Sequence, residues 1–123
     1  MRSLAAILAA ALLLSAPEPV DHYQAFEDRL NTYRASNGLK PLQWDKWMYD
    51  TSRWNNMYQA SRGMGHYYTA NARRQNACQG AVNADMALDA WMQSPAHNAG
   101  LLDPYITRAA LARRGPYWTW SAR

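Results

Sequence analysis

The feature that most constrains the fold lies in residues 91–102, where a predicted helix must end and the chain must change direction. Ser94 stands directly before Pro95, and a proline ring disfavours the helical conformation of the residue before it. His97 therefore lies just beyond a helix end, where its side chain can turn into a cleft. His66 follows the end of another predicted helix. Two histidines at two helix exits of one small domain indicate a shared site.

The apolar run at residues 4–14 predicts a signal peptide at the start of the chain. It consists of Leu, Ala and Ile only and follows Arg2. A run of this length is too short to span a bilayer, which needs about 20 residues, and it is typical of a secretory leader. We assign residues 1–16 to the signal peptide, 17–25 to a spacer and the start of the first helix, and 26–123 to one domain. The protein is therefore predicted to be secreted, either extracellular or periplasmic.

Composition limits how this domain is stabilised and what it binds. The only cysteine is Cys78, so no disulfide can form within the chain. Six Trp and eight Tyr supply the large buried areas that core packing then requires. The net charge of +4 permits weak attraction to anionic surfaces. Basic and aromatic residues do not alternate at a regular spacing, and we predict no nucleic-acid partner.

Periodicity and end signals predict helices first and a hairpin last. Asp21, Asp45 and Asn83 are expected to cap helices, and Gly38 and Gly65 to adopt the left-handed conformation at helix ends. Residues 67–80 have no clear period and are expected to be irregular. The predicted elements are helices over 21–36, 45–62 and 84–93, a short turn over 96–102, and strands over 107–112 and 117–121. This order predicts an α+β fold in packed layers.

Several segments resemble the CAP superfamily of cysteine-rich secretory, antigen 5 and pathogenesis-related proteins, in its compact bacterial form. The segments are residues 30–45, Met64-Gly65-His66, residues 75–80, residues 91–102 and the final Tyr117-Trp118-Thr119. Together they extend over most of residues 26–120. The resemblance implies a secreted protein with the CAP (SCP) domain, a three-layer α-β-α sandwich in which helices flank a small antiparallel sheet. Lipid binding is also associated with this family.

In that family, two histidines and two acidic residues line a central cleft that can hold a divalent metal ion. His66 and His97 match the two histidines, whereas Gln75 and Ser94 stand at the acidic positions. The predicted cleft-lining residues are His66, Gln75, Asn76, Ser94 and His97. Structural zinc takes four protein ligands and catalytic zinc three. His66 and His97 are therefore the candidate ligands of a divalent metal such as zinc, bound weakly.

Three functions follow from these residues. The first is a non-catalytic secreted module, a monomer whose cleft binds a small ligand, a lipid or a protein partner. The second is a metal-dependent hydrolase of peptides or cell-envelope substrates, which would need Asp85 or Asp89 beside the histidines. The third is a lipid carrier. A Ser94–His97 nucleophile and base is disfavoured, because no nucleophile elbow and no orienting acid accompany them.

Overall fold

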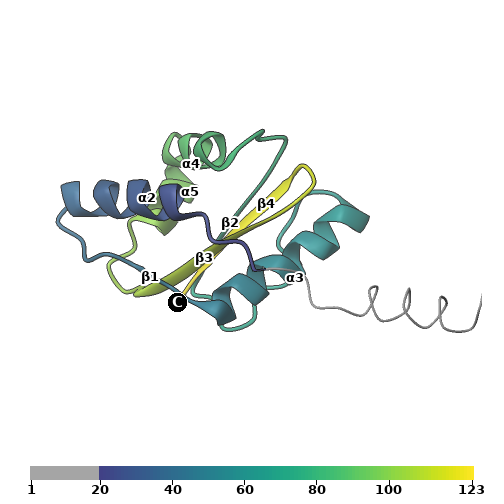
Figure 1. The fold of residues 1–123 in the computed structure, drawn as a ribbon, viewed down its shortest axis with the longest axis horizontal. Helices are drawn as coiled ribbons and strands as arrows, with labels where there is room; N and C mark the ends of the chain where they lie inside the picture. Colours follow the sequence, from purple (N-terminus) through teal and green to yellow (C-terminus); the bar gives the residue numbers. More distant parts are fainter. Residues whose placement is uncertain (1–19) are drawn as a thin grey trace, which may run out of the picture.

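The computed structural model describes residues 20–123, so the predicted signal peptide and residues 17–19 of the spacer lie outside the described residues. The elements carry the labels of Figure 1. In chain order they are α2 (Gln24–Ser36), β1 (Gln43–Trp44), α3 (Lys46–Arg62), β2 (Arg74–Gln79), α4 (Ala84–Met92), α5 (Pro95–Leu101), β3 (Arg108–Arg114) and β4 (Tyr117–Ala122). This is the α+β fold that the sequence predicts.

One four-stranded sheet, in the order β1-β3-β4-β2, lies at the centre of the domain. The predicted hairpin β3–β4 forms its middle, and β2 pairs antiparallel with β4. The two-residue β1 runs parallel to β3, so the expected all-antiparallel sheet is wrong at this edge. Helix α3 packs on one face, and α2, α4 and α5 cover the other (Figure 1). The three-layer α-β-α arrangement is therefore confirmed.

Alternation along the hairpin sends two different kinds of side chain to the two faces. Leu111, Trp118 and Trp120 pack against α2, α4 and α5 in a large apolar cluster. Their neighbours Thr119 and Ser121 point to α3 and are fully buried. Because strand side chains alternate between faces, this hairpin presents large apolar side chains to α2, α4 and α5. To α3 it presents the hydroxyl groups of Thr119 and Ser121 together with Ala110 and Ala112.

The buried side of α3 is apolar at its start, where Met48 and Tyr49 pack with Ala110 and Ala112 of β3, and polar further along. Ser52 Oγ donates to Ala110 O and contacts Ser121 Oγ at 2.9 Å, while Asn55 and Gln59 both donate to Thr119 Oγ1. Two tryptophans of this helix are exposed, Trp47 at 51% and Trp54 at 46%. Satisfied hydrogen bonds allow the polar groups to be buried, and they select this face of the helix.

The predicted residue stands at three of these helix ends, and a different residue stands at the other two. The Asn83 side chain caps α4 by accepting from the Met86 amide at 2.9 Å, and Gly38 adopts a φ of +74°. The residue before α2 is Tyr23 rather than Asp21, and Asp45 precedes α3 without a capping side-chain bond. Gly63, at φ +90°, makes the left-handed turn expected of Gly65. Position alone did not distinguish two glycines two residues apart.

Strand β2 is the element that the sequence analysis missed. Its residues, Arg74–Gln79, fall in the stretch expected to be irregular. β2 is an outer strand, and polar side chains on both of its faces make hydrogen bonds. Its sequence therefore lacks the alternation of apolar and polar residues that predicts a strand. This strand carries two of the candidate site residues, Gln75 and Asn76.

Candidate functional site

The outer strand β2 places two predicted site residues next to each other, with their side chains on opposite faces of the sheet. Gln75 pairs with Ser121 and faces α3, whereas Asn76 pairs with Trp120 and faces α5. The loop after α3 places His66 beside Gln75, and α5 places His97 beside Asn76. We refer to His66, Gln75, Asn76, Ser94 and His97 as the histidine site.

His66 is oriented by the Gln75 side chain. The Gln75 amide NH2 donates to Tyr68 O at 2.8 Å and to Ser121 Oγ at 3.1 Å, which fixes its oxygen as the atom that faces the imidazole. His66 Nδ1 lies 2.8 Å from that oxygen. Because an amide oxygen only accepts, Nδ1 carries the hydrogen. Neutral His66, which is exposed, therefore has its lone pair on Nε2.

His97 is held at both its ring and its backbone. Its Nδ1 lies 2.8 Å from Ser94 Oγ, and Asn76 Nδ2 donates to its carbonyl oxygen at 3.1 Å. Burial, and then the nearby charge of His66, lower the pKa of His97. The lowered pKa favours the neutral form of the His97 imidazole at pH 7.

Among the described residues, the contact between Ser94 and His97 lacks the acid that orients a catalytic histidine. A catalytic serine is deprotonated through a histidine whose second nitrogen is oriented by an acid. Within residues 20–123, neither imidazole is hydrogen-bonded to a carboxylate. Ser94 occupies the residue before the first turn of α5, and Pro95 follows it at the start of the helix. The geometry thus agrees with the helix-ending interpretation of Ser94.

The donor set does not fit a resident metal ion. Asp85 and Asp89, the carboxylates that a metal site would need, both form ion pairs with Arg29 of α2. Across the described residues, no group of three or more His, Cys, Asp or Glu side chains is arranged to hold a metal. Two imidazoles fall short of the three or four protein ligands of zinc. Burial raises the pKa of the Cys78 thiol to about 11, which disfavours the thiolate that binds a metal.

A buried carboxylate fastens β2 to the end of α5, and the sequence analysis did not identify it. Asp103 is 2% exposed and accepts from Arg73 Nε at 2.8 Å and from Arg74 Nε at 2.9 Å. It also accepts from the Tyr105 amide at 2.8 Å. Burial raises its pKa, but these hydrogen bonds outweigh burial and bring the pKa to about 2. Asp103 thereby fixes the strand that carries Gln75 and Asn76.

We expect Asp103→Asn to lower the free energy of unfolding by about 2 kcal/mol at pH 7. The folded pKa lies below the unfolded one, so the ionised carboxylate stabilises the fold above about pH 4, and this contribution is lost as the pH falls through about 2. Urea unfolding at pH 7 and pH 3 measures it. Asp50→Asn, which breaks an exposed pair with Lys46, is the control and should cost less than about 1 kcal/mol. Equal losses at both pH values would contradict this account.

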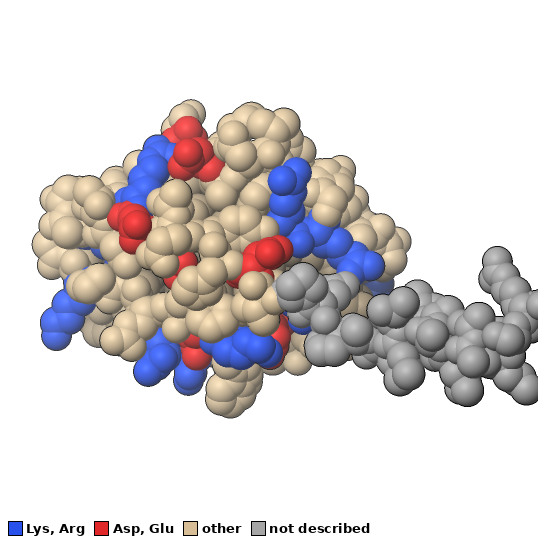
Figure 2. Space-filling view, viewed as in Figure 1, with Lys and Arg blue, Asp and Glu red and all other residues tan. Residues whose placement is uncertain are grey.

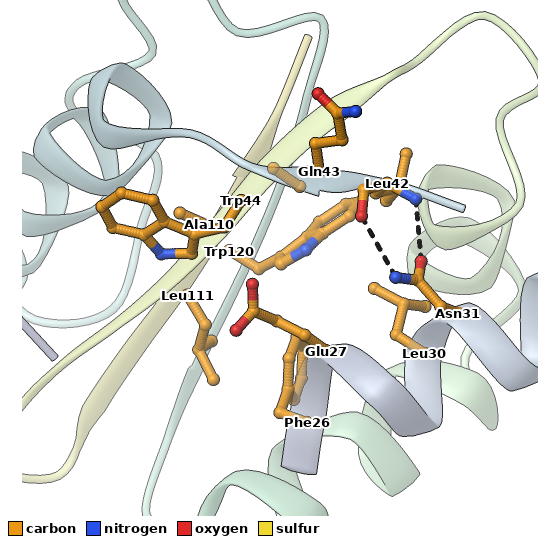
Figure 3. A pocket seen from close by; sticks show the side chains of 11 residues that line it. Phe26, Glu27, Leu30, Asn31, Leu42, Gln43, Trp44, Ala110, Leu111 and Trp120 are labelled. Atoms are coloured by element: carbon orange, nitrogen blue, oxygen red, sulfur yellow. Dashed lines mark hydrogen bonds between the residues drawn. The ribbon is translucent and has the colours of Figure 1, made fainter. Parts of the chain in front are cut away.

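A narrow apolar pocket lies elsewhere, between α2, β1 and β3 (Figure 3). It contains none of the five residues of the histidine site. Glu27 Oε2 and Trp44 Nε1 are buried there without a hydrogen-bond partner, and burial raises the pKa of Glu27. The cavity volume is about 10 Å³, which is room for roughly one water molecule. The pocket is therefore too small for an organic ligand in this conformation.

The sequence of residues 27–114 matches the model of the CAP family, described as the cysteine-rich secretory protein family. The chain belongs to this family. No curated protein sequence is significantly similar to it. The family explains why the chain has helices on both faces of one small sheet, and it confirms the resemblance carried by residues 30–45 and 91–102.

Solved structures of bacterial proteins share the fold of this CAP domain at low sequence identity. A cysteine-rich secretory protein from Staphylococcus aureus has a TM-score of 0.71 and 17% identity, over 87% of this chain and 40% of that one. An extracellular protein with an SCP domain from Bacillus anthracis has a TM-score of 0.71 and 16% identity, over 80% and 39%. An outer surface protein from Borrelia burgdorferi has a TM-score of 0.70 and 14% identity, over 88% and 98%. The chain spans about two fifths of the first two proteins.

The names of these neighbours describe extracellular or outer surface proteins. Within residues 20–123, none of the helices combines the length and the apolar character needed to cross a membrane.

Proposed function

We propose that this CAP domain is an exported, monomeric and non-catalytic binding module, and that the histidine site takes an extracellular small molecule, lipid or protein. One observation carries the proposal: each imidazole uses Nδ1 on an uncharged partner of its own chain, Gln75 for His66 and Ser94 for His97. Nε2 of each ring is then left to a ligand. A site of imidazole, amide and hydroxyl groups recognises hydrogen-bonding ligands, and among the described residues neither imidazole is oriented by a carboxylate as in a catalytic triad.

Export rests on the predicted leader at residues 1–16 and on the extracellular or outer-surface names of the structural neighbours. The metal-dependent hydrolase has less support as a second candidate. It needs a carboxylate beside the histidines, and Asp85 and Asp89 are engaged by Arg29.

The test is to identify what remains bound to the protein after export and gentle purification, by native mass spectrometry and organic extraction. We expect one compound at near-stoichiometric amount in the wild type, and at least a tenfold lower amount in His66→Ala and His97→Ala. His22→Ala is the matched control, because His22 lies on Trp44, outside the histidine site. A compound retained equally by all variants, or no compound in any preparation, would contradict the proposal.

A further inference from the structure

The end of α2 carries the one Asn-Gly pair of the sequence, Asn37-Gly38. Both residues are exposed. Helix α2 ends at the left margin of the molecule in Figure 1, and Figure 2 shows this margin as part of the molecular surface. Because glycine has no side chain, its backbone nitrogen meets the least steric hindrance when it approaches Cγ of the asparagine before it. This pairing of residues is the one that asparagine deamidation favours.

Hydrogen bonds close the helix end around this pair. Gly38, at a φ of +74°, donates from its backbone nitrogen to Ala35 O at 3.0 Å, and the Leu39 backbone nitrogen donates to Arg34 O at 3.0 Å. These two bonds form a Schellman motif, which is common where helices end. Arg34 Nε also donates to Lys40 O at 3.0 Å and so holds the chain that follows. The nitrogen that would attack Asn37 is therefore bonded elsewhere in the folded protein.

The Asn37 side chain is held in a conformation that does not react. Its Nδ2 donates to Tyr33 O at 2.9 Å and lies 3.4 Å from Ser36 Oγ. The backbone ψ of 14° turns the Gly38 nitrogen away from Asn37 Cγ. Attack requires rotation about ψ and loss of the Gly38 hydrogen bond, so the helix end must open first. Helix ends open locally at a lower free energy than the whole domain unfolds.

We propose that Asn37 is a modification site, at which deamidation occurs only when the Schellman motif at the end of α2 opens. Hydroxide removes the Gly38 amide proton, and the nitrogen attacks Asn37 Cγ to close a succinimide ring. The Cγ–Nδ2 bond breaks, and the amine takes a proton from water and leaves as ammonia. Water then opens the ring at either carbonyl to give aspartate or isoaspartate, without any oxidation or reduction. This site is independent of the function proposed for the histidine site.

Peptide mass mapping of the purified protein, incubated at pH 8 with and without urea, tests the proposal. In urea we expect Asn37 to convert faster than Asn71, which is exposed but precedes Ala72. In the folded protein, conversion of Asn37 should be at least tenfold slower than in urea. Gly38→Ala should slow the conversion in urea severalfold, because the added methyl group hinders attack. Equal rates with and without urea, or no preference for Asn37 in urea, would overturn the proposal.

Arg34→Met tests whether the end of α2 controls the reaction. This variant removes the hydrogen bond to Lys40 O and keeps the Asn-Gly pair. We expect at least threefold faster conversion of Asn37 in the folded state. Arg29→Met, on the same helix but at the surface, should convert at the wild-type rate. An Arg34→Met rate equal to that of the wild type would overturn the proposal.

Amide hydrogen exchange of Gly38 and Leu39 in the wild type keeps the test decisive if Arg34→Met does not fold. The exchange rates give the fraction of time that these two hydrogen bonds are open. We expect the folded rate of conversion to equal the rate in urea multiplied by this open fraction. A folded rate that exceeds this product more than tenfold would mean that the reaction needs no opening, and would overturn the proposal.

Discussion

Trp120→Ala should lower the free energy of unfolding by about 4 kcal/mol, the largest effect we expect from one substitution. Trp120 is 1% exposed, in the middle of β4. It packs in the cluster that joins the sheet to α2, α4 and α5. Truncation removes a large apolar side chain and leaves a cavity that the surrounding strands cannot close. Urea unfolding followed by circular dichroism measures the loss.

Trp54→Ala is the matched control for this prediction. Trp54 is 46% exposed on α3 and lies 6.1 Å from the Tyr68 ring, centroid to centroid. We expect it to cost about 1 kcal/mol or less, because its aromatic contact is at the surface. Similar losses in the two variants would contradict the assignment of Trp120 to the core.

Arg34→Met should cost about 3 kcal/mol, although methionine keeps much of the length of the side chain. Arg34 is 1% exposed. Its Nε donates to Lys40 O at 3.0 Å, and its Nη1 donates to Leu101 O at 2.8 Å and to Asp103 O at 3.0 Å. The substitution leaves three carbonyl groups without these donors. It also loosens the end of α5, the helix that carries His97.

The control is Arg29→Met on the same helix, where the arginine pairs with Asp85 and Asp89 at the exposed surface. Exposed ion pairs contribute at most about 1 kcal/mol. Chemical denaturation at pH 7 compares the two variants. If Arg34→Met is no more destabilised than Arg29→Met, the buried guanidinium does not hold Lys40 and the segment 101–103 to α2.

The sequence predicted the fold well where local signals agree with tertiary packing. Asn83 caps α4 as expected, and Pro95 and Ser94 separate α4 from α5. The terminal hairpin was also correct, because alternation is clear when one face is apolar. Strand β2 was missed, since its hydrogen-bonding partners lie far away in the sequence. Periodicity of apolar residues carries no signal for a polar buried face.

The sequence named the five candidate residues but not the hydrogen bonds between them. His66 and His97 were identified from their positions after helix ends and from the family resemblance. Their partners through Nδ1, Gln75 and Ser94, were also named, but neither hydrogen bond could be derived from spacing. Arg34 and Asp103, which fix the surrounding segments, were missed. A buried charged residue has no local signature when its partners are carbonyl groups of distant loops.

Calorimetric titration of the purified protein with zinc tests most directly whether the histidine site lacks a resident metal. Our account predicts no saturable binding in the micromolar range, because two imidazoles without a carboxylate provide too few ligands. His97→Ala should then give the same titration as the wild type. One-to-one micromolar binding that is abolished in a folded His97→Ala variant would contradict the account and restore the metal-dependent hydrolase.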